Sequence, residues 1–125
     1  MRETITIILE IPHKSLSQNK PSSTFGGRMG KAREVKKYRL SALKAIEQQG
    51  VSGWQKAELH ASFYYKTKRR RDSLNSMGML KGAIDGVIDA GLLPDDDSEH
   101  LIPLAPSICL DTYAPRVELT FTRLD

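Results

Sequence analysis

The pattern of hydrophobic and polar residues predicts four β-strands along the chain. Residues 4–11 carry isoleucine or leucine at every second position, and the opposite positions are also partly apolar. A strand with two partly apolar faces is typical of the middle of a sheet, so we expect this strand to be central. Residues 57–66 and 117–122 alternate in the same way. A short apolar run at residues 101–104 predicts the fourth strand.

Two segments have the residue spacing of an amphipathic helix. Residues 31–49 are rich in helix-forming residues, and Gly50 follows them as a helix stop. A second helix is predicted to end at Ala90 and to begin at Asp72 or Ser73, because either side chain can accept hydrogen bonds from first-turn backbone N–H groups. Its buried stripe is expected to consist of Met77, Leu80, Ile84, Val87 and Ile88.

The order of these elements predicts the fold class. Residues 12–30 are rich in Ser, Asn, Pro, Gly and Lys and are expected to form a long basic loop, while residues 94–99 form an acidic loop. The resulting order of strand, loop, helix, strand, helix, strand, strand favours an α/β (α+β) fold, in which a small mixed β-sheet packs against two main helices. A chain of 125 residues has the size of one domain, so residues 1–125 are predicted to form a single domain.

The sequence carries no signal that predicts export or insertion into a membrane. The first apolar stretch, Ile5 to Ile11, is interrupted by Thr6 and Glu10 and lacks a small-residue cleavage site. The single cysteine, Cys109, cannot form an internal disulfide, which is typical of a reducing compartment. We therefore expect a cytoplasmic protein with no membrane partner.

Charge is distributed very unevenly along the chain. Residues 1–71 carry 16 lysines and arginines against 5 acids, a net charge of +11, whereas residues 72–125 carry 3 against 10, a net charge of −7. A basic region attracts phosphates, and grouped carboxylates attract divalent cations. The asymmetry indicates metal-dependent work on nucleic acid, although a polarised, solvated surface would explain it equally well.

Two sequence motifs carry a more specific resemblance. The stretch from Arg69 to Asn75 reads RRRDSLN, and the stretch from Leu80 to Asp96 reads LKGAIDGVIDAGLLPDD. Together they resemble RusA-type Holliday junction resolvases, whose pattern is two basic residues, D-x-D-N, a spacer, K-x-x-x-D, a small turn and D-D. The segment after the first strand, which contains Ser15, Leu16, Ser17 and Asn19, resembles the proline- and asparagine-bearing loop of that family.

The resemblance implies a function and a set of site residues. Enzymes of this family are Mg²⁺-dependent endonucleases that act as homodimers and cut four-way DNA junctions during recombination and repair. By residue match, Asp72 and Asp96 are expected to be catalytic residues and Mg²⁺ ligands. Lys81 matches the family lysine and is expected to stabilise charge on the scissile phosphate.

Nucleic-acid contacts are expected from two basic segments. The run Lys68, Arg69, Arg70 and Arg71 directly precedes Asp72, so we interpret it as a surface for the DNA backbone, with Lys14 and Asn19 contributing from the early loop. The alternative is an ordinary solvated charge patch. Lys81 likewise has an alternative explanation, an ion pair with Asp85 one helical turn away.

The chain departs from the family pattern at Leu74, where the second aspartate is expected. Leucine has no oxygen to offer a metal ion, so cleavage is expected to be impaired unless Ser73, Asn75 or Asp97 supplies a replacement. The spacing also differs, because Lys81 follows Asp72 by nine residues, whereas some family members use six. A non-catalytic protein that binds DNA junctions with the same fold is therefore the alternative function.

Overall fold

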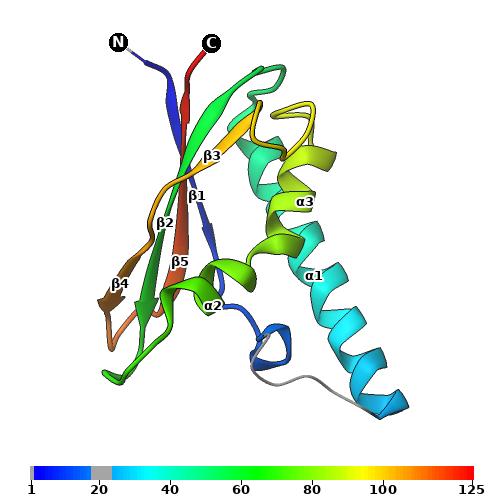
Figure 1. Ribbon diagram of the computed structural model, residues 1–125, viewed down its shortest axis with the longest axis vertical. Helices are drawn as coiled ribbons and strands as arrows, with labels where there is room; N and C mark the ends of the chain where they lie inside the picture. Colours follow the sequence, from blue (N-terminus) through cyan, green and yellow to red (C-terminus); the bar gives the residue numbers. More distant parts are fainter. Residues whose placement is uncertain (1, 18–23) are drawn as a thin grey trace.

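A β-sheet forms one layer of the protein, and helices cover one of its faces (Figure 1). The computed structural model describes residues 2–17 and 24–125. Over these residues the elements follow the order β1 (Thr4–Leu9), the 3-10 helix η1 (Lys14–Leu16), α1 (Phe25–Gln49), β2 (Ala57–Tyr65), α2 (Ser73–Gly78), α3 (Lys81–Asp89), β3 (Leu101–Pro103), β4 (Ser107–Leu110) and β5 (Arg116–Arg123). The predicted α+β fold, with a mixed sheet and two main helices, is confirmed.

The sheet has the strand order β1-β5-β2-β3, and β4 also pairs with β2. β5 lies antiparallel between β1 and β2, whereas β3 and β4 run parallel to successive parts of β2. β1 therefore lies at an edge, and the prediction of a central strand was wrong. The partly apolar outer face of β1 is open, and Ile8 on that face is 63% exposed. β4 had not been predicted from the sequence.

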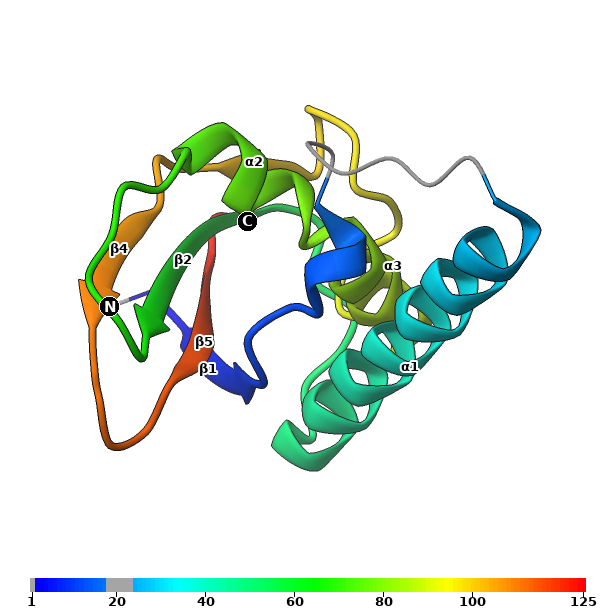
Figure 2. The same ribbon diagram turned by 90° about the horizontal axis from the view of Figure 1, so that it is seen from below.

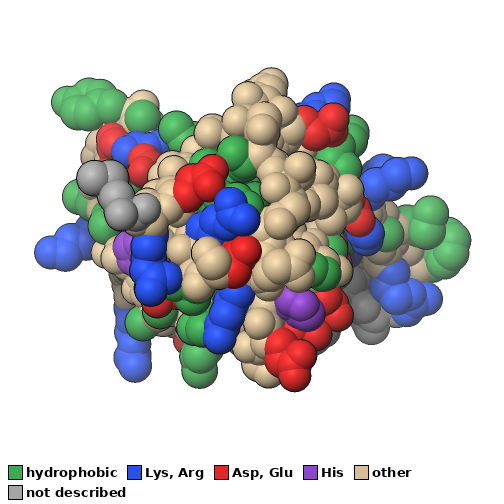
Figure 3. Space-filling view, turned by 90° about the horizontal axis from the view of Figure 1, so that it is seen from above, with side chains coloured by type: hydrophobic (Ala, Val, Ile, Leu, Met, Phe, Trp, Pro, Cys, Tyr) green, Lys and Arg blue, Asp and Glu red, His purple; other side chains and the backbone are tan. Residues whose placement is uncertain are grey.

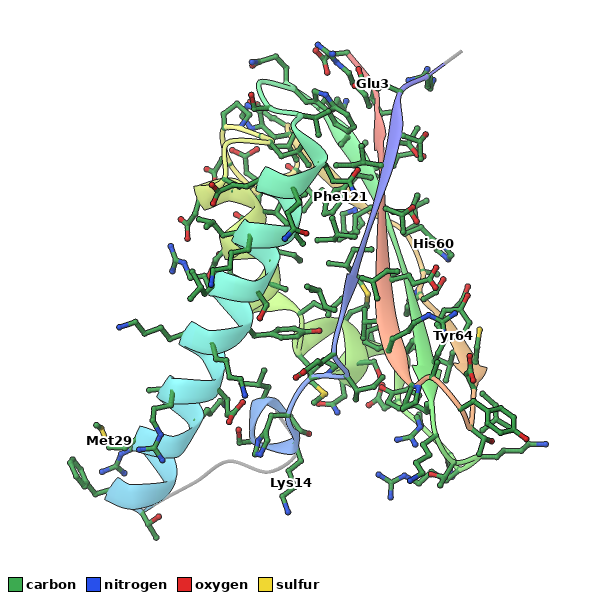
Figure 4. All side chains as sticks on the ribbon, turned by 180° about the vertical axis from the view of Figure 1, so that it is seen from behind. Glu3, Lys14, Met29, His60, Tyr64 and Phe121 are labelled. Carbon is green, nitrogen blue, oxygen red and sulfur yellow. The ribbon has the colours of Figure 1, made fainter. Side chains whose placement is uncertain are left out.

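The core lies between the helices and one face of the sheet. The alternation in β1, β2 and β5 places every second side chain in this core, as predicted. Figure 4 shows Phe121 pointing toward the helices, while His60 and Tyr64 point to the opposite face of the sheet. The largest fully buried side chains are Trp54, Phe63, Phe121, Ile7, Ile46, Leu59, Leu80, Leu92, Leu119, Val87 and Val117.

α1 begins earlier than its sequence pattern predicted. The expected loop at residues 12–30 instead contains η1 and the first turns of α1, which starts at Phe25 with Thr24 as its N-cap. The Thr24 side chain accepts a hydrogen bond from the Gly27 backbone N–H at 3.0 Å. Two glycines in the first turn obscured this helix, because each disfavours helix by about 1 kcal/mol relative to alanine. Among the described residues, no helix has the length and apolar character needed to cross a membrane.

The second predicted helix is divided into α2 and α3. Met79 and Leu80 lie between them, and the Leu80 backbone adopts a ψ angle of −2°, away from that of a regular α-helix. α2 is fastened to β2 by a hydrogen bond of 3.1 Å between the hydroxyl groups of Tyr65 and Ser76. The break allows α2 to stay on the end of β2 while α3 packs along α1 (Figure 2).

Close contact between α1 and α3 depends on small residues that the predicted stripe did not include. Leu80 and Val87 are buried as expected, and Met77, Ile84 and Ile88 are partly buried against the core. Gly82, Ala83 and Gly86 complete the buried face of α3. A Cβ atom on Gly86 would collide with the carbonyl oxygen of Arg39 in α1. The two helix backbones therefore approach each other too closely for a side chain at this position.

Candidate nucleic-acid interface

Five cationic side chains line a cavity of about 530 Å³ beside the end of β2. Lys66, Arg69, Arg70 and Arg71 come from the loop between β2 and α2, and Lys14 comes from η1. We call this the basic cavity. Figure 1 shows α2 and the blue segment that follows β1 in the lower half of the molecule, and a hydrogen bond of 3.3 Å from the Ser17 hydroxyl to the Asn75 side-chain oxygen joins the two segments.

Local contacts fix the position of Arg71 at this cavity. Its guanidinium group lies over the Tyr65 ring, 3.5 Å from the ring centroid, and donates a hydrogen bond to the Thr67 carbonyl oxygen. Desolvation, with repulsion from Arg69, lowers the pKa of the Arg71 guanidinium from its ordinary value, although arginine still remains charged near neutral pH. The result is a positive charge held in place by an aromatic ring.

Carboxylates do not neutralise this group of cations. Among residues 2–17 and 24–125, none of the five cations of the basic cavity, nor Lys68, forms an ion pair with an Asp or Glu side chain. Lys68, Arg69 and Arg70 are exposed. Phosphate oxygens are suitable partners, because arginine and lysine form strong charge-assisted hydrogen bonds with them.

Asp72 lies at the same cavity and begins α2 as its N-cap. Its Oδ1 atom accepts hydrogen bonds from the backbone N–H groups of Leu74, at 2.9 Å, and Asn75, at 3.3 Å. This confirms the predicted capping role and fixes the direction of the carboxylate. The fold therefore holds the Asp72 carboxylate at the cavity that the arginines of the basic run line.

Leu74 supplies no carboxylate where the family pattern expects one, and two of the three candidate replacements are engaged in other contacts. Leu74 is 84% exposed on α2, so its side chain contributes little to the core. The Asn75 side-chain oxygen already accepts a hydrogen bond from Ser17, and Asp97 pairs with His100 at 2.6 Å. Ser73, the third candidate replacement, is an exposed first-turn residue of α2.

Lys81 lies between two carboxylates. Its ammonium nitrogen is 2.5 Å from Asp96 Oδ2 and 3.0 Å from Asp85 Oδ1. The hydrogen bond from Lys81 lowers the pKa of the Asp96 carboxyl, and the same bond raises the pKa of Lys81. The ion pair with Asp85, which the sequence analysis gave as the alternative explanation for Lys81, is therefore present together with a second one.

Three aspartates of the acidic loop, Asp95, Asp96 and Asp97, have hydrogen-bond partners within the chain. Asp95 accepts a hydrogen bond from the Asp96 backbone N–H at 2.7 Å. The bond from His100 lowers the pKa of Asp97 below its ordinary value. In the space-filling view from above, acidic side chains gather beside a histidine at the lower right (Figure 3).

The expected metal ligands fall into two different groups. Asp72 lines the basic cavity, whereas Asp96 does not line it and pairs with Lys81 instead. Across the part of the chain that the structure describes, no three His, Cys, Asp or Glu side chains form a group that could hold a metal ion. As arranged, these residues do not fit Mg²⁺, and the magnesium site stays a prediction from the family resemblance.

No protein-family model matches this sequence, and the curated proteins contain no significant match. Membership of the RusA-type family therefore stays a prediction based on the sequence motifs. The geometry bears on the individual residues instead: it brings Lys14, Arg69, Arg70, Arg71 and Asp72 to one cavity. Asn19 lies outside the described residues.

The structure also adds residues that the sequence analysis missed. Lys66 lines the basic cavity. It was not predicted as a site residue, because it is the last residue of the strand predicted at residues 57–66. Pro115, in the turn that leads to β5, lines the cavity from a distant part of the sequence. Proximity to the basic run could have identified Lys66, whereas no local signal points to Pro115.

Proposed function

We propose that this protein is a RusA-type Holliday junction resolvase, an endodeoxyribonuclease that acts on four-way DNA junctions as a homodimer in the cytoplasm. The basic cavity is the observation that carries the proposal. Lysines and arginines from η1 and from the loop after β2 converge there beside Asp72. Such a surface suits a ligand with several phosphates, and the motifs around it are those that resemble the resolvase family.

The cations of the basic cavity would bind the DNA backbone. Arg69 and Arg70 are exposed and can each present two N–H groups to phosphate oxygens, while Arg71 is held against Tyr65. Phosphate contacts set the position and orientation of DNA without reading its base sequence. We therefore expect recognition of DNA shape, with little dependence on sequence.

The position of Asp72 suits a carboxylate that acts close to a bound phosphate. Its Oδ1 atom accepts two backbone hydrogen bonds, which fixes the carboxylate direction at the cavity. Lys81 lies in a separate cluster with Asp85 and Asp96, so its charge is already engaged there. Strand cleavage is expected to be weak in this chain, because Leu74 supplies no oxygen.

A non-catalytic protein that binds DNA junctions is the second candidate. Leu74 favours it, because this exposed leucine occupies the position of a family metal ligand on the first turn of α2. This candidate shares the basic cavity and the preference for branched DNA with the first one. The two differ only in whether the chain can hydrolyse the phosphodiester backbone.

Cleavage assays with Leu74→Asp separate these candidates. A synthetic four-way junction and a linear duplex of the same arm sequence are incubated with each protein in Mg²⁺ or in EDTA. We expect the unaltered protein to bind the junction more tightly than the duplex and to cut it slowly. Leu74→Asp should cut the junction faster in Mg²⁺ alone, because it restores a carboxylate oxygen at an exposed position.

Ser73→Asp is the matched control. It adds the same charge to the same exposed helical turn, one residue away from the family position. Faster cutting by Leu74→Asp but not by Ser73→Asp would support a resolvase with one disabled ligand. Binding without cutting by all three proteins would favour the non-catalytic candidate. Equal affinity for junction and duplex would contradict both.

A further inference from the structure

Tyr113 is held almost completely in solvent at the turn between β4 and β5. Its side chain is 98% exposed, whereas Tyr38 and Tyr65 are buried in the core. Tyrosine has a large apolar ring that gains stability when it packs against another surface. Tyr113 has no such role in the fold, so its exposed ring is available to an external partner.

The backbone beneath this ring is braced by a network of hydrogen bonds. Asp111 Oδ1 accepts from the backbone N–H groups of Tyr113 and Ala114, both at 3.0 Å. Arg116 donates to Asp111 Oδ2 at 2.8 Å and to the Ala114 carbonyl oxygen at 2.7 Å. Because the turn is already ordered, a ligand would have to order little more than the tyrosine side chain itself.

A second set of contacts anchors the turn to the sheet. The Arg116 guanidinium lies over the Tyr64 ring, 4.0 Å from its centroid, and donates to Glu118 Oε2 at 2.7 Å. The Asp111 backbone N–H donates to the Tyr65 carbonyl oxygen at 2.8 Å. Tyr65 is the last residue of β2, so the turn is fixed directly to the strand from which the basic run begins.

The turn that carries the exposed ring borders the basic cavity. Pro115 lines that cavity and is only two residues away from Tyr113 in the braced turn. Figure 1 shows the turn between β4 and β5 beside the end of β2, where the loop to α2 starts. An exposed aromatic ring next to a group of cations is the combination that proteins use to bind unpaired nucleotides, stacking on bases while cations hold the phosphates.

We propose that Tyr113 is a stacking site for an unpaired DNA base whose backbone phosphates lie in the basic cavity. This inference rests on the proposed function, because it requires that the protein binds DNA. Bases within a duplex already stack on their neighbours, so they offer no free face to a tyrosine. Single strands and the branch point of a junction expose such faces, and stacking on them tolerates any base sequence.

Fluorescence of the Tyr113→Trp variant tests the contact directly. The chain has one natural tryptophan, Trp54, which is only 1% exposed, so a change on DNA binding would come from position 113. We expect single-stranded DNA, or a junction with unpaired bases at its centre, to quench the emission. A fully paired linear duplex should leave the emission almost unchanged.

Binding measurements with three further variants complete the test. Tyr113→Ala should weaken binding to single-stranded DNA by roughly fivefold to a hundredfold, the usual cost of losing one base stack. Tyr113→Phe should keep the affinity, because it keeps a ring. Thr112→Ala, in the same exposed turn, is the control and should bind as the unaltered protein does.

The outcomes distinguish this inference from the proposed function. If the unaltered protein binds junctions while Tyr113→Ala binds equally well, the stacking site is overturned and the proposed function stands. Equal quenching by the paired duplex would also overturn it, since no unpaired base would then be required. If the unaltered protein binds neither junctions nor single strands, the proposed function fails and this inference fails with it.

Discussion

Two strongly charged segments lie near α2 and α3: the basic run, residues 68–71, and the acidic loop, residues 94–99. Their charged side chains differ in the contacts that they make within the chain. In the acidic loop, Asp96 is paired with Lys81 and Asp97 with His100. In the basic run, Arg71 is held by an aromatic ring and a carbonyl oxygen, neither of which cancels its charge. Two carboxylates of the acidic loop are thus paired with cationic partners within the chain, whereas no side chain of the basic run forms an ion pair with a carboxylate among the described residues.

This difference indicates that the fold favours binding of anions over binding of metal cations. The fold favours anion binding, because Arg69, Arg70 and Arg71 of the basic run share a cavity and have no carboxylate partners among the described residues. Cation binding would require Asp96 to leave Lys81 and a further ligand to take the place of Leu74. We therefore expect DNA binding to withstand changes in the acidic loop and to fail when the basic run is neutralised.

The largest effect is expected from replacing Arg69, Arg70 and Arg71 with glutamine. DNA affinity should fall by at least about tenfold, equivalent to about 1.4 kcal/mol, because phosphate contacts are lost. The slope of log affinity against log salt concentration should flatten by about 0.9 for each contact removed. Fluorescence anisotropy with labelled junctions over a range of salt concentrations measures both quantities.

A matched variant on α1 controls for net charge. Replacing Lys36, Lys37 and Lys44 with glutamine removes the same charge from exposed helical positions outside the basic cavity. This variant should keep most of the affinity and most of the salt slope. Equal losses in the two variants would mean that binding follows overall charge, and the contrast between the basic run and the rest of the surface would disappear.

An intermediate effect is expected from Gly86→Ala, which alters the packing of α3, the helix that carries the Lys81 partner of the acidic loop. The new methyl group would collide with the Arg39 carbonyl oxygen and push α3, which carries Lys81 and Asp85, away from α1. Overpacking of this kind costs about 1–3 kcal/mol, more than alanine gains through helix propensity. Urea unfolding should show the lower stability, while DNA affinity per folded molecule should change little.

Gly26→Ala is the control for Gly86→Ala. A Cβ atom at Gly26 in α1 would meet no atom within 4 Å. This variant should therefore leave the stability unchanged or raise it by up to about 1 kcal/mol, since alanine favours helix. If Gly86→Ala were as stable as the unaltered protein, the close approach of α1 and α3 would not constrain position 86.

The smallest effect is expected from Lys81→Met, which removes the internal partner of Asp96. The pKa of Asp96 should rise toward its ordinary value, because the hydrogen bond from Lys81 is the main cause of its lowering. A carboxyl with a lowered pKa stabilises the folded state at neutral pH and loses this effect as pH falls through its folded pKa. The exposed pair should contribute less than about 1 kcal/mol at pH 7.

Urea unfolding at pH 7 and pH 3, with NMR titration of the carboxyl groups, measures this effect. The stability difference between Lys81→Met and the unaltered protein should be present at pH 7 and smaller at pH 3. Asp85→Asn leaves the Lys81–Asp96 bond in place, so the pKa of Asp96 should stay low in that variant. A difference of the same size at both pH values would point to lost packing rather than to the ion pair.

Local patterns predicted much of the fold. The alternation in β2 correctly indicated that every second residue of this strand faces the core, and Asp72 was one of the two caps predicted from residue type. The start of α1 and the division between α2 and α3 were missed. The start of α1 was missed because two glycines follow Phe25 and lower the helix propensity of the first turn. The division between α2 and α3 was missed because it depends on packing against different partners.

The sequence by itself determined features whose physical causes are local: strand faces from alternation, the end of α1 from Gly50, the start of α2 from its capping residue, and the basic character of the segment before Asp72. Tertiary structure alone decided the edge position of β1, because sheet order depends on which distant strand pairs with it. It also brought Lys14 and Pro115 to the basic cavity and joined Asp96 to Lys81. These contacts link residues that are far apart along the chain, and no local pattern encodes such distances.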